Sequence, residues 1–140
     1  MLQPSPNVLN AFGLRDPHLS PAPRGWGRGI LADSIVLTPV VDRARATWSA
    51  RIRDTLDPSG IRIARPFRAT DGRTIVGDWR ADRYGAGVLQ NRPDEVVATS
   101  LRLHDALASH DRPRFLVGGP STPWSETDYF SMADRAAFHP

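Results

Sequence analysis

The fold of this chain is decided by residues 30–40, which read ILADSIVLTPV. Two apolar runs flank Asp33-Ser34, and such a dipeptide favours a tight turn between two paired strands. Pro39 has no backbone N–H to donate, so the second strand is expected to end there or to lie at a sheet edge. These residues therefore predict an antiparallel hairpin.

A helix is expected directly after this hairpin, over about residues 43–56. Asp42 precedes it as an N-cap, because an aspartate side chain accepts a hydrogen bond from the first turn. Residues 57–60, DPSG, end the helix, since proline and glycine both interrupt helical structure. Apolar residues spaced four apart are expected to form its buried stripe: Ala44, Trp48, Ile52 and Leu56.

The segment that follows predicts further strands. Residues 61–69 are a strand candidate that Pro66 interrupts, and residues 73–76 are its expected partner. Asp71-Gly72, between the two, is a strong signal for a hairpin turn. Residues 78–84 are expected to be extended as well.

A second helix is expected from Pro93 to about His110. Proline suits the first helical position, and Asp94 and Glu95 lie in the first turn, where the helix dipole favours acidic side chains. The buried face of this helix is expected to consist of its larger apolar residues: Val96, Val97, Leu101, Leu103 and Leu107.

The order of these elements predicts an α+β fold, with a small antiparallel sheet packed by one helix. A hinge-like segment and one or two further helices follow the sheet. Residues 1–24 are rich in proline and are expected to be an irregular lead-in. Residues 25–87 hold the sheet and the first helix, and residues 88–140 hold the second helix and a C-terminal tail.

The composition of the 140 residues excludes several classes of site. All 18 basic residues are arginines, and the chain has neither lysine nor cysteine. A GC-rich coding sequence is the simplest explanation of the arginine bias. The lack of cysteine excludes disulfides, zinc–thiolate centres and thiol nucleophiles.

The sequence also lacks the signals that direct a chain to a membrane. The first twelve residues do not have the pattern of a signal peptide, and no apolar run approaches the roughly 18 residues of a membrane span. We therefore expect a cytoplasmic location and no membrane partner.

The glycine-rich segment Arg24-Gly25-Trp26-Gly27-Arg28-Gly29 is the sharpest candidate for a functional site. Alternating glycines permit unusual backbone angles and close approach to another group. One interpretation is a phosphate or anion cradle formed by Arg24, Gly25, Gly27, Arg28 and Gly29. The other is a flexible turn between two strands.

Two other groups of polar residues give weaker signals. His104 and Asp105 are adjacent on the second expected helix and do not face each other, so no acid–base pair is expected. The tail residues Glu126, Asp128, Asp134 and His139 fit no known ligand spacing, so no metal site is expected.

Nucleic-acid binding would require arginines that share one face with aromatic residues between them. The four arginines that come closest do not form one compact stripe at helical spacing: Arg43, Arg45, Arg51 and Arg53. Nucleic acid is therefore not an expected partner. A protein-binding surface or the core would each account for the aromatic residues Trp79, Trp124, Tyr129 and Phe130.

Several short motifs resemble a known family. They are residues 24–40, the helix with Trp48, Ile63-Ala64-Arg65-Pro66 and Asp71-Gly72-Arg73. Together they resemble an uncharacterised actinobacterial family related to aminoglycoside phosphotransferases, which have the two-lobed kinase-like fold. The resemblance covers most of this chain but only the small-lobe portion of such a family member.

The resemblance assigns roles to several segments. It implies that Gly25-Trp26-Gly27 is the glycine-rich loop over nucleotide phosphates, and that residues 78–87 are the hinge between lobes. The strand 35–40 would carry the phosphate-binding lysine, but Thr38 stands at that position. The helix 43–56 has no glutamate to pair with such a lysine, and the catalytic lobe is missing.

These departures favour a non-catalytic, pseudokinase-like module that acts by binding a protein partner, with no catalytic residue and no cofactor. ATP would be a ligand only if the resemblance extends to function. One alternative is a truncated or split aminoglycoside-phosphotransferase-like enzyme that needs a separate large lobe. Another is an arginine-dependent anion or nucleic-acid binder.

Overall fold

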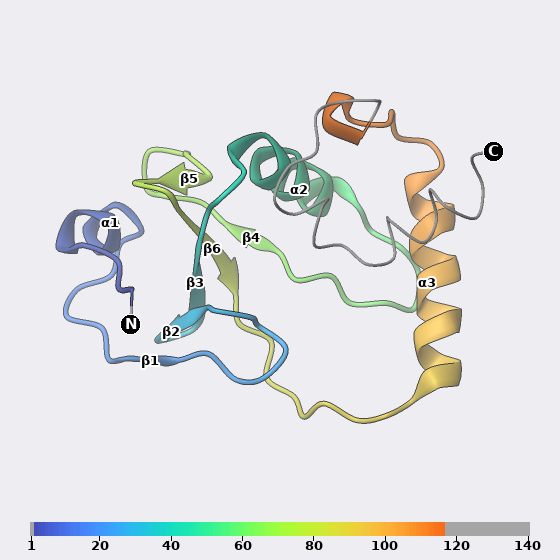
Figure 1. Cartoon of the computed structure of the whole chain (residues 1–140), viewed down its shortest axis with the longest axis horizontal. Helices are drawn as coiled ribbons and strands as arrows, with labels where there is room; N and C mark the ends of the chain where they lie inside the picture. The colour runs from blue at the N-terminus through green and yellow to red at the C-terminus, as the bar shows by residue number, and fades with distance from the viewer. Residues whose placement is uncertain (1, 117–140) are drawn as a thin grey trace.

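A computed structural model describes residues 2–116 of the chain, which form an α+β fold as the sequence predicts (Figure 1). The elements in chain order are α1 (Pro6–Ala11), β1 (Leu19–Pro21), β2 (Ile30–Ala32), β3 (Ile35–Pro39), α2 (Arg43–Thr55), β4 (Pro66–Phe67), β5 (Ile75–Val76), β6 (Trp79–Arg83), α3 (Pro93–Leu107) and the short 3-10 helix η1 (Arg114–Leu116).

The six strands form one antiparallel sheet in the order β1-β2-β3-β6-β4, and β5 also pairs with β6. The hairpin predicted from residues 30–40 is confirmed, because Ile30 pairs with Leu37 and Ala32 with Ile35. β3 ends at Pro39, as expected. It nevertheless lies inside the sheet, since β6 pairs along its other side.

The sequence prediction for the second hairpin was wrong in its pairing. Asp71-Gly72 does reverse the chain, and the Gly72 N–H donates to the Ala69 carbonyl at 2.9 Å. The flanking strands β4 and β5, however, both pair with β6 rather than with each other. The tight hairpin forms at Gly77-Asp78, where φ is +52° and +62°, the positive angles that a two-residue strand connection favours.

One face of the sheet holds the apolar core. Because side chains alternate along a strand, Ile35 and Leu37 of β3 share this face, and both are at most 4% exposed. Val8 of α1 and the adjacent Phe12 cover them. Residues 1–24, expected to be an irregular lead-in, therefore contain a helix that completes the core and a strand, β1, that extends the sheet.

α2 lies on the opposite face of the sheet. The expected N-cap is confirmed, since the Asp42 carboxylate accepts a hydrogen bond from the Arg45 N–H at 3.0 Å. The expected stripe was only half right, because Ala44 is exposed and Trp48 is half-buried. The helix instead buries Ala46, Ala50 and Ile52, together with Leu56 just beyond its end. Small alanine side chains let the helix approach the sheet closely.

α3 begins at Pro93, as expected, but its buried face was predicted wrongly. None of its residues is buried, and Val96, Val97 and Leu101 are at least 60% exposed. Figure 1 shows α3 at the opposite end of the molecule from α1. Helical periodicity identifies the apolar side of a helix, but it does not supply an element to cover that side.

Candidate functional site

The glycine-rich segment forms the loop between β1 and β2, which pair antiparallel. Backbone hydrogen bonds fold the loop into two successive turns: Trp26 N–H donates to Pro23 at 3.2 Å, and Gly29 N–H donates to Trp26 at 3.2 Å. An anion cradle uses free backbone N–H groups. The N–H groups of Trp26 and Gly29 are already engaged within the loop.

Close packing accounts for one of the loop glycines. A β-carbon on Gly29 would lie 2.5 Å from Cγ1 of Val36, so no larger residue fits beside β3 without displacement. Trp26 lies against Tyr84, with ring centroids 6.0 Å apart. These contacts hold the loop against β3 and the segment after β6, so this part of it is not a freely flexible turn.

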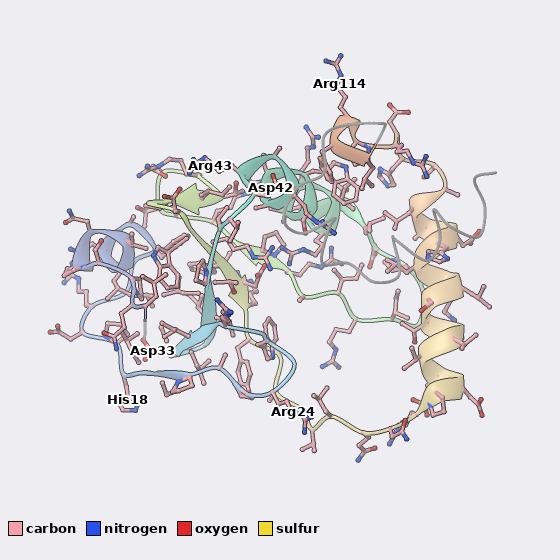
Figure 2. All side chains as sticks on the ribbon, in the orientation of Figure 1. His18, Arg24, Asp33, Asp42, Arg43 and Arg114 are labelled. Carbon is pink, nitrogen blue, oxygen red and sulfur yellow. The ribbon has the colours of Figure 1, made fainter. Side chains whose placement is uncertain are left out.

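The two arginines of the loop remain accessible. Arg24 and Arg28 are exposed, and neither has a carboxylate within 4.0 Å among residues 2–116. Figure 2 shows Arg24 at the edge of the molecule. The structure thus brings the predicted anion-binding residues together on one loop, and their role in binding stays a prediction.

Thr38 lies on β3 directly across from Arg80 of β6. Directly opposed side chains in an antiparallel pair project to the same face and lie about 5 Å apart at their β-carbons. Thr38 itself is half-buried and carries no charge. The positive charge nearest to this position along the strand pair therefore comes from Arg80 on the neighbouring strand.

Arg53 and Asp82 form an ion pair between α2 and the sheet, which the sequence did not reveal. The Arg53 Nη1 atom lies 2.6 Å from Oδ1 of Asp82, and the two side chains are 19% and 5% exposed. Arg53 also donates to the Ala64 carbonyl and to the Ser49 hydroxyl. Arg80 approaches the same carboxylate at 3.6 Å. A buried carboxylate requires such partners, because removing it from water costs several kcal/mol.

An apolar surface extends from the end of the sheet along α3. We call it the 88–101 apolar surface; its members are 60–86% exposed and are Val88, Leu89, Val96, Val97 and Leu101. Val88, Leu89 and Val96 line one groove. Leu89 also lies against the glycine-rich loop, since a β-carbon on Gly25 would be 3.4 Å from its Cδ2 atom.

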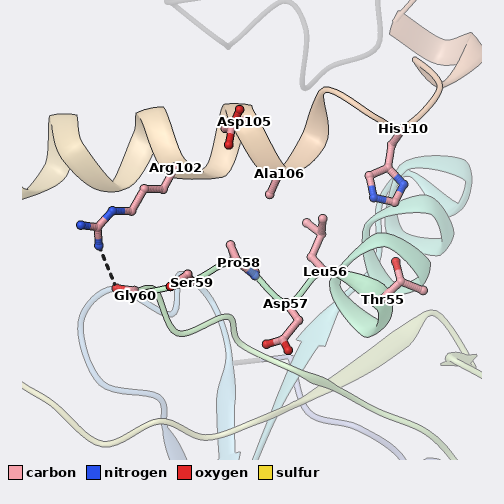
Figure 3. Close-up of a pocket in the computed structure, with 10 residues that line it drawn as sticks. All are labelled: Thr55, Leu56, Asp57, Pro58, Ser59, Gly60, Arg102, Asp105, Ala106 and His110. Carbon is pink, nitrogen blue, oxygen red and sulfur yellow. Dashed lines mark hydrogen bonds between the residues drawn. The ribbon is translucent and has the colours of Figure 1, made fainter.

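A cavity of about 590 Å³ lies between the end of α2 and α3. Figure 3 shows Arg102 reaching across it to the Gly60 carbonyl, at 3.3 Å. His110 and Asp105 also line it, but among residues 2–116 no hydrogen bond joins them. His104 and Asp105, adjacent on α3, are both exposed.

Asp71 is the one described group with a clear pKa shift. The backbone N–H of Arg73 donates to its carboxylate at 3.0 Å, and the Arg73 guanidinium lies 2.7 Å away. Hydrogen bonding to the ionised form lowers the pKa of the Asp71 carboxyl, and the backbone N–H is the main cause. Because Asp71 is exposed in a turn, we assign this interaction to turn stability.

Two further expectations concern metals and membranes. Within residues 2–116 there is no group of three histidine, cysteine or acidic side chains that could hold a metal ion. None of the helices in that range is both long and apolar enough to cross a lipid bilayer. The acidic tail group and the aromatic residues Trp124, Tyr129 and Phe130 lie outside the described residues.

No known protein family, no curated protein and no solved structure significantly matches this chain. The resemblance to relatives of the aminoglycoside phosphotransferases therefore rests on short sequence motifs and stays a prediction.

Proposed function

We propose that this chain is a non-catalytic, kinase-small-lobe-like module that acts by binding a protein partner. The partner docks on the 88–101 apolar surface. The observation that supports this proposal is the exposure of five large apolar side chains on and beside one helix.

Burial of the 88–101 apolar surface by a partner would be favourable in free energy. Complete burial of one valine or leucine side chain stabilises a complex by roughly 1.5–3 kcal/mol of transfer free energy. Large contiguous apolar surfaces on soluble proteins commonly mark interaction sites. Arg92 and Glu95 border the groove that Val88, Leu89 and Val96 line, and their charges pair with each other at 3.2 Å. Arg102 and Asp105 lie on the side of α3 that faces residues 55–60.

The arrangement of charges supports a non-catalytic role. A kinase-like lobe positions phosphates with a lysine on its third strand, which pairs with a glutamate on the following helix. In this chain Thr38 occupies the third strand, the helix supplies the cation Arg53, and the strand β6 supplies the carboxylate Asp82. Compared with the kinase pair, the cation lies on the helix and the carboxylate on the sheet. The Arg53 guanidinium is bound by Asp82, the Ala64 carbonyl and the Ser49 hydroxyl.

The alternative of a split enzyme has its own support. A glycine-rich loop between the first two strands, a third strand and then a helix is the order of elements that kinases use around nucleotide phosphates. If a separately encoded large lobe completed such a site, Arg24 and Arg28 would be the accessible cations over the phosphates.

An affinity-capture experiment tests the proposal. The full chain, immobilised, is exposed to lysate of cells that contain it, alongside the variant Val97→Glu/Leu101→Glu. We expect one captured protein to be lost with the variant. Val41→Glu is the matched control, because Val41 is a 68% exposed valine away from this surface, and it should retain the partner.

A thermal melt separates the split-enzyme alternative. That alternative predicts that Mg²⁺-ATP or Mg²⁺-GTP raises the melting temperature of the wild type but not of Arg24→Glu/Arg28→Glu. The proposed function predicts no rise in melting temperature that depends on these two arginines.

In the capture experiment, a partner that is still captured by Val97→Glu/Leu101→Glu would contradict docking on the 88–101 apolar surface.

A further inference from the structure

A second surface, separate from the 88–101 apolar surface, combines arginines with aromatic rings. It is a groove of about 850 Å³, open to solvent, between the outer face of α2 and residues 111–115. We call it the arginine–aromatic groove, and the residues that matter for its chemistry are Arg43, Trp48, Arg51, Arg112, Arg114 and Phe115.

The groove has a strong excess of positive charge. Four arginines line it against a single carboxylate, that of Asp111. Arg43 is paired with Asp78 at 2.9 Å, but both side chains are more than 60% exposed, so water and salt weaken that pair. Among residues 2–116, Arg51, Arg112 and Arg114 have no carboxylate within 4.0 Å. Figure 2 shows Arg114 projecting away from the body of the molecule.

Two aromatic rings lie in the same groove. The centroids of Trp48 and Phe115 are 5.8 Å apart, and their planes meet at 81°, an edge-to-face arrangement. In such a pair the edge of one ring contacts the face of the other, so the first ring keeps both faces clear of its partner. Both residues are only half-buried. Two partly exposed aromatic rings therefore line the groove, where a planar group could pack against them.

The fold assembles this set from distant parts of the chain. Arg43 and Arg51 lie two turns apart on one side of α2, with Trp48 between them, while Arg45 and Arg53 point elsewhere. Residues 111–115 then bring two more arginines and Phe115 to the same side. The separation of Arg43 and Arg51 along the helix, about 12 Å, favours an extended polyanion over a single phosphate.

We propose that the arginine–aromatic groove binds single-stranded nucleic acid. A basic groove that follows the phosphates, combined with aromatic faces for unpaired bases, is the chemistry by which proteins hold single strands without reading sequence. A duplex does not fit this requirement, because its bases are stacked on one another and are not free to stack on Trp48 or Phe115.

The binding test uses the full chain with fluorescein-labelled oligothymidylate and oligouridylate of about 12 nucleotides, followed by fluorescence anisotropy. If Arg51, Arg112 and Arg114, which have no carboxylate within 4.0 Å among residues 2–116, each contact one phosphate, the slope of log affinity against log salt is about −2, so affinity falls about 20-fold between roughly 50 and 200 mM salt. A slope near zero would overturn the proposal.

Charge-reversal variants locate the site. Arg51→Glu/Arg114→Glu is expected to weaken binding at least about tenfold and to make the salt slope shallower by about 1.4, because two phosphate contacts are lost. Arg62→Glu, which changes an exposed arginine outside the groove, should stay within about twofold of the wild type. Equal losses of affinity in Arg51→Glu/Arg114→Glu and Arg62→Glu would overturn the assignment of binding to the arginine–aromatic groove. A third variant, Arg28→Glu, changes the glycine-rich loop, and a loss of affinity found only in that variant would overturn the assignment as well.

Aromatic variants test stacking. Trp48→Ala is expected to weaken binding at least about fivefold, with folding checked by circular dichroism. Phe115→Leu keeps an apolar side chain and serves if Trp48→Ala does not fold. Unchanged affinity in folded variants would overturn the stacking role. Binding of a duplex as tightly as a single strand, or equally tight binding of a mononucleotide, would overturn the assignment to single-stranded nucleic acid.

Discussion

The Nη1 atom of Arg53 on α2 lies 2.6 Å from the Oδ1 atom of Asp82 on β6, at a place where the carboxylate side chain is only 5% exposed. This pair joins the helix to the central part of the sheet. Arg53 also donates to the Ala64 carbonyl, so one guanidinium links α2, the segment before β4 and β6.

Removal of one member of this pair should destabilise the protein strongly. Asp82→Leu leaves the guanidinium of Arg53 without its anion in a largely buried place, and we expect a loss of about 3 kcal/mol in the free energy of unfolding. Urea denaturation measures this loss. Arg53→Met/Asp82→Leu should be more stable than Asp82→Leu alone, because the guanidinium closest to the lost carboxylate is removed as well. Arg43→Ala, which breaks the exposed pair with Asp78, should cost less than about 1 kcal/mol. Strictly additive losses in the double variant would contradict a coupled pair.

Gly29 should be intolerant of any side chain because of its contact with β3. Gly29→Ala places a β-carbon 2.5 Å from Val36, and we expect a loss of about 1–3 kcal/mol in unfolding free energy. In a protein that already carries Val36→Ala, adding Gly29→Ala should cost less unfolding free energy than it does in the wild type, because the clashing Val36 side chain has been shortened. Gly85→Ala is the control, since nothing lies within 4 Å of its β-carbon position, and it should be nearly neutral. A neutral Gly29→Ala would mean that the loop does not pack against Val36.

The turn at Asp71 should make a pH-dependent contribution to stability. Because the pKa of the Asp71 carboxyl is lowered in the folded state, its stabilisation is present above the unfolded value near 4 and is lost as pH falls through the folded value. We therefore expect Asp71→Asn to melt at a lower temperature than the wild type near neutral pH. The two should converge as pH falls through the lowered pKa of the folded Asp71 carboxyl. A difference that is constant across this pH range would contradict the role of the charge.

The exposed position of α3 predicts that its apolar residues contribute little to the stability of the chain by itself. Val97→Glu and Leu101→Glu should each change the unfolding free energy by less than about 0.5 kcal/mol. Leu37→Ala in the core, where the side chain is fully buried, should cost about 2–5 kcal/mol. If Val97→Glu were as damaging as Leu37→Ala, α3 would be buried against the rest of the chain.

Local signals in the sequence predicted local structure well. The turn at Asp33-Ser34, the N-cap Asp42 and the helix start at Pro93 each depend on neighbouring residues, and all three are confirmed. In each case the decisive contacts lie within a few residues.

Non-local relationships were not predictable from the same signals. Both β4 and β5 pair with β6, although Asp71-Gly72 between them is a typical hairpin signal. Arg53 turns inward because Asp82, 29 residues later, lies on the facing strand. The grouping of Arg43 and Arg51 with Arg112 and Arg114 depends on where residues 111–115 return to α2. Such contacts follow from the assembled fold, and helical spacing alone does not identify them.

Site-specific photocrosslinking at residue 97 tests the proposed protein-binding role most directly. A photoreactive amino acid replaces Val97 in the full chain, inside cells that contain the partner, and Val41 is replaced in the control. We predict one dominant crosslink to a different protein at residue 97, lost when Leu101→Glu is added and absent at residue 41. The absence of a crosslink at residue 97, equal crosslinks at both positions, or a crosslink only to a second copy of this chain would contradict the account.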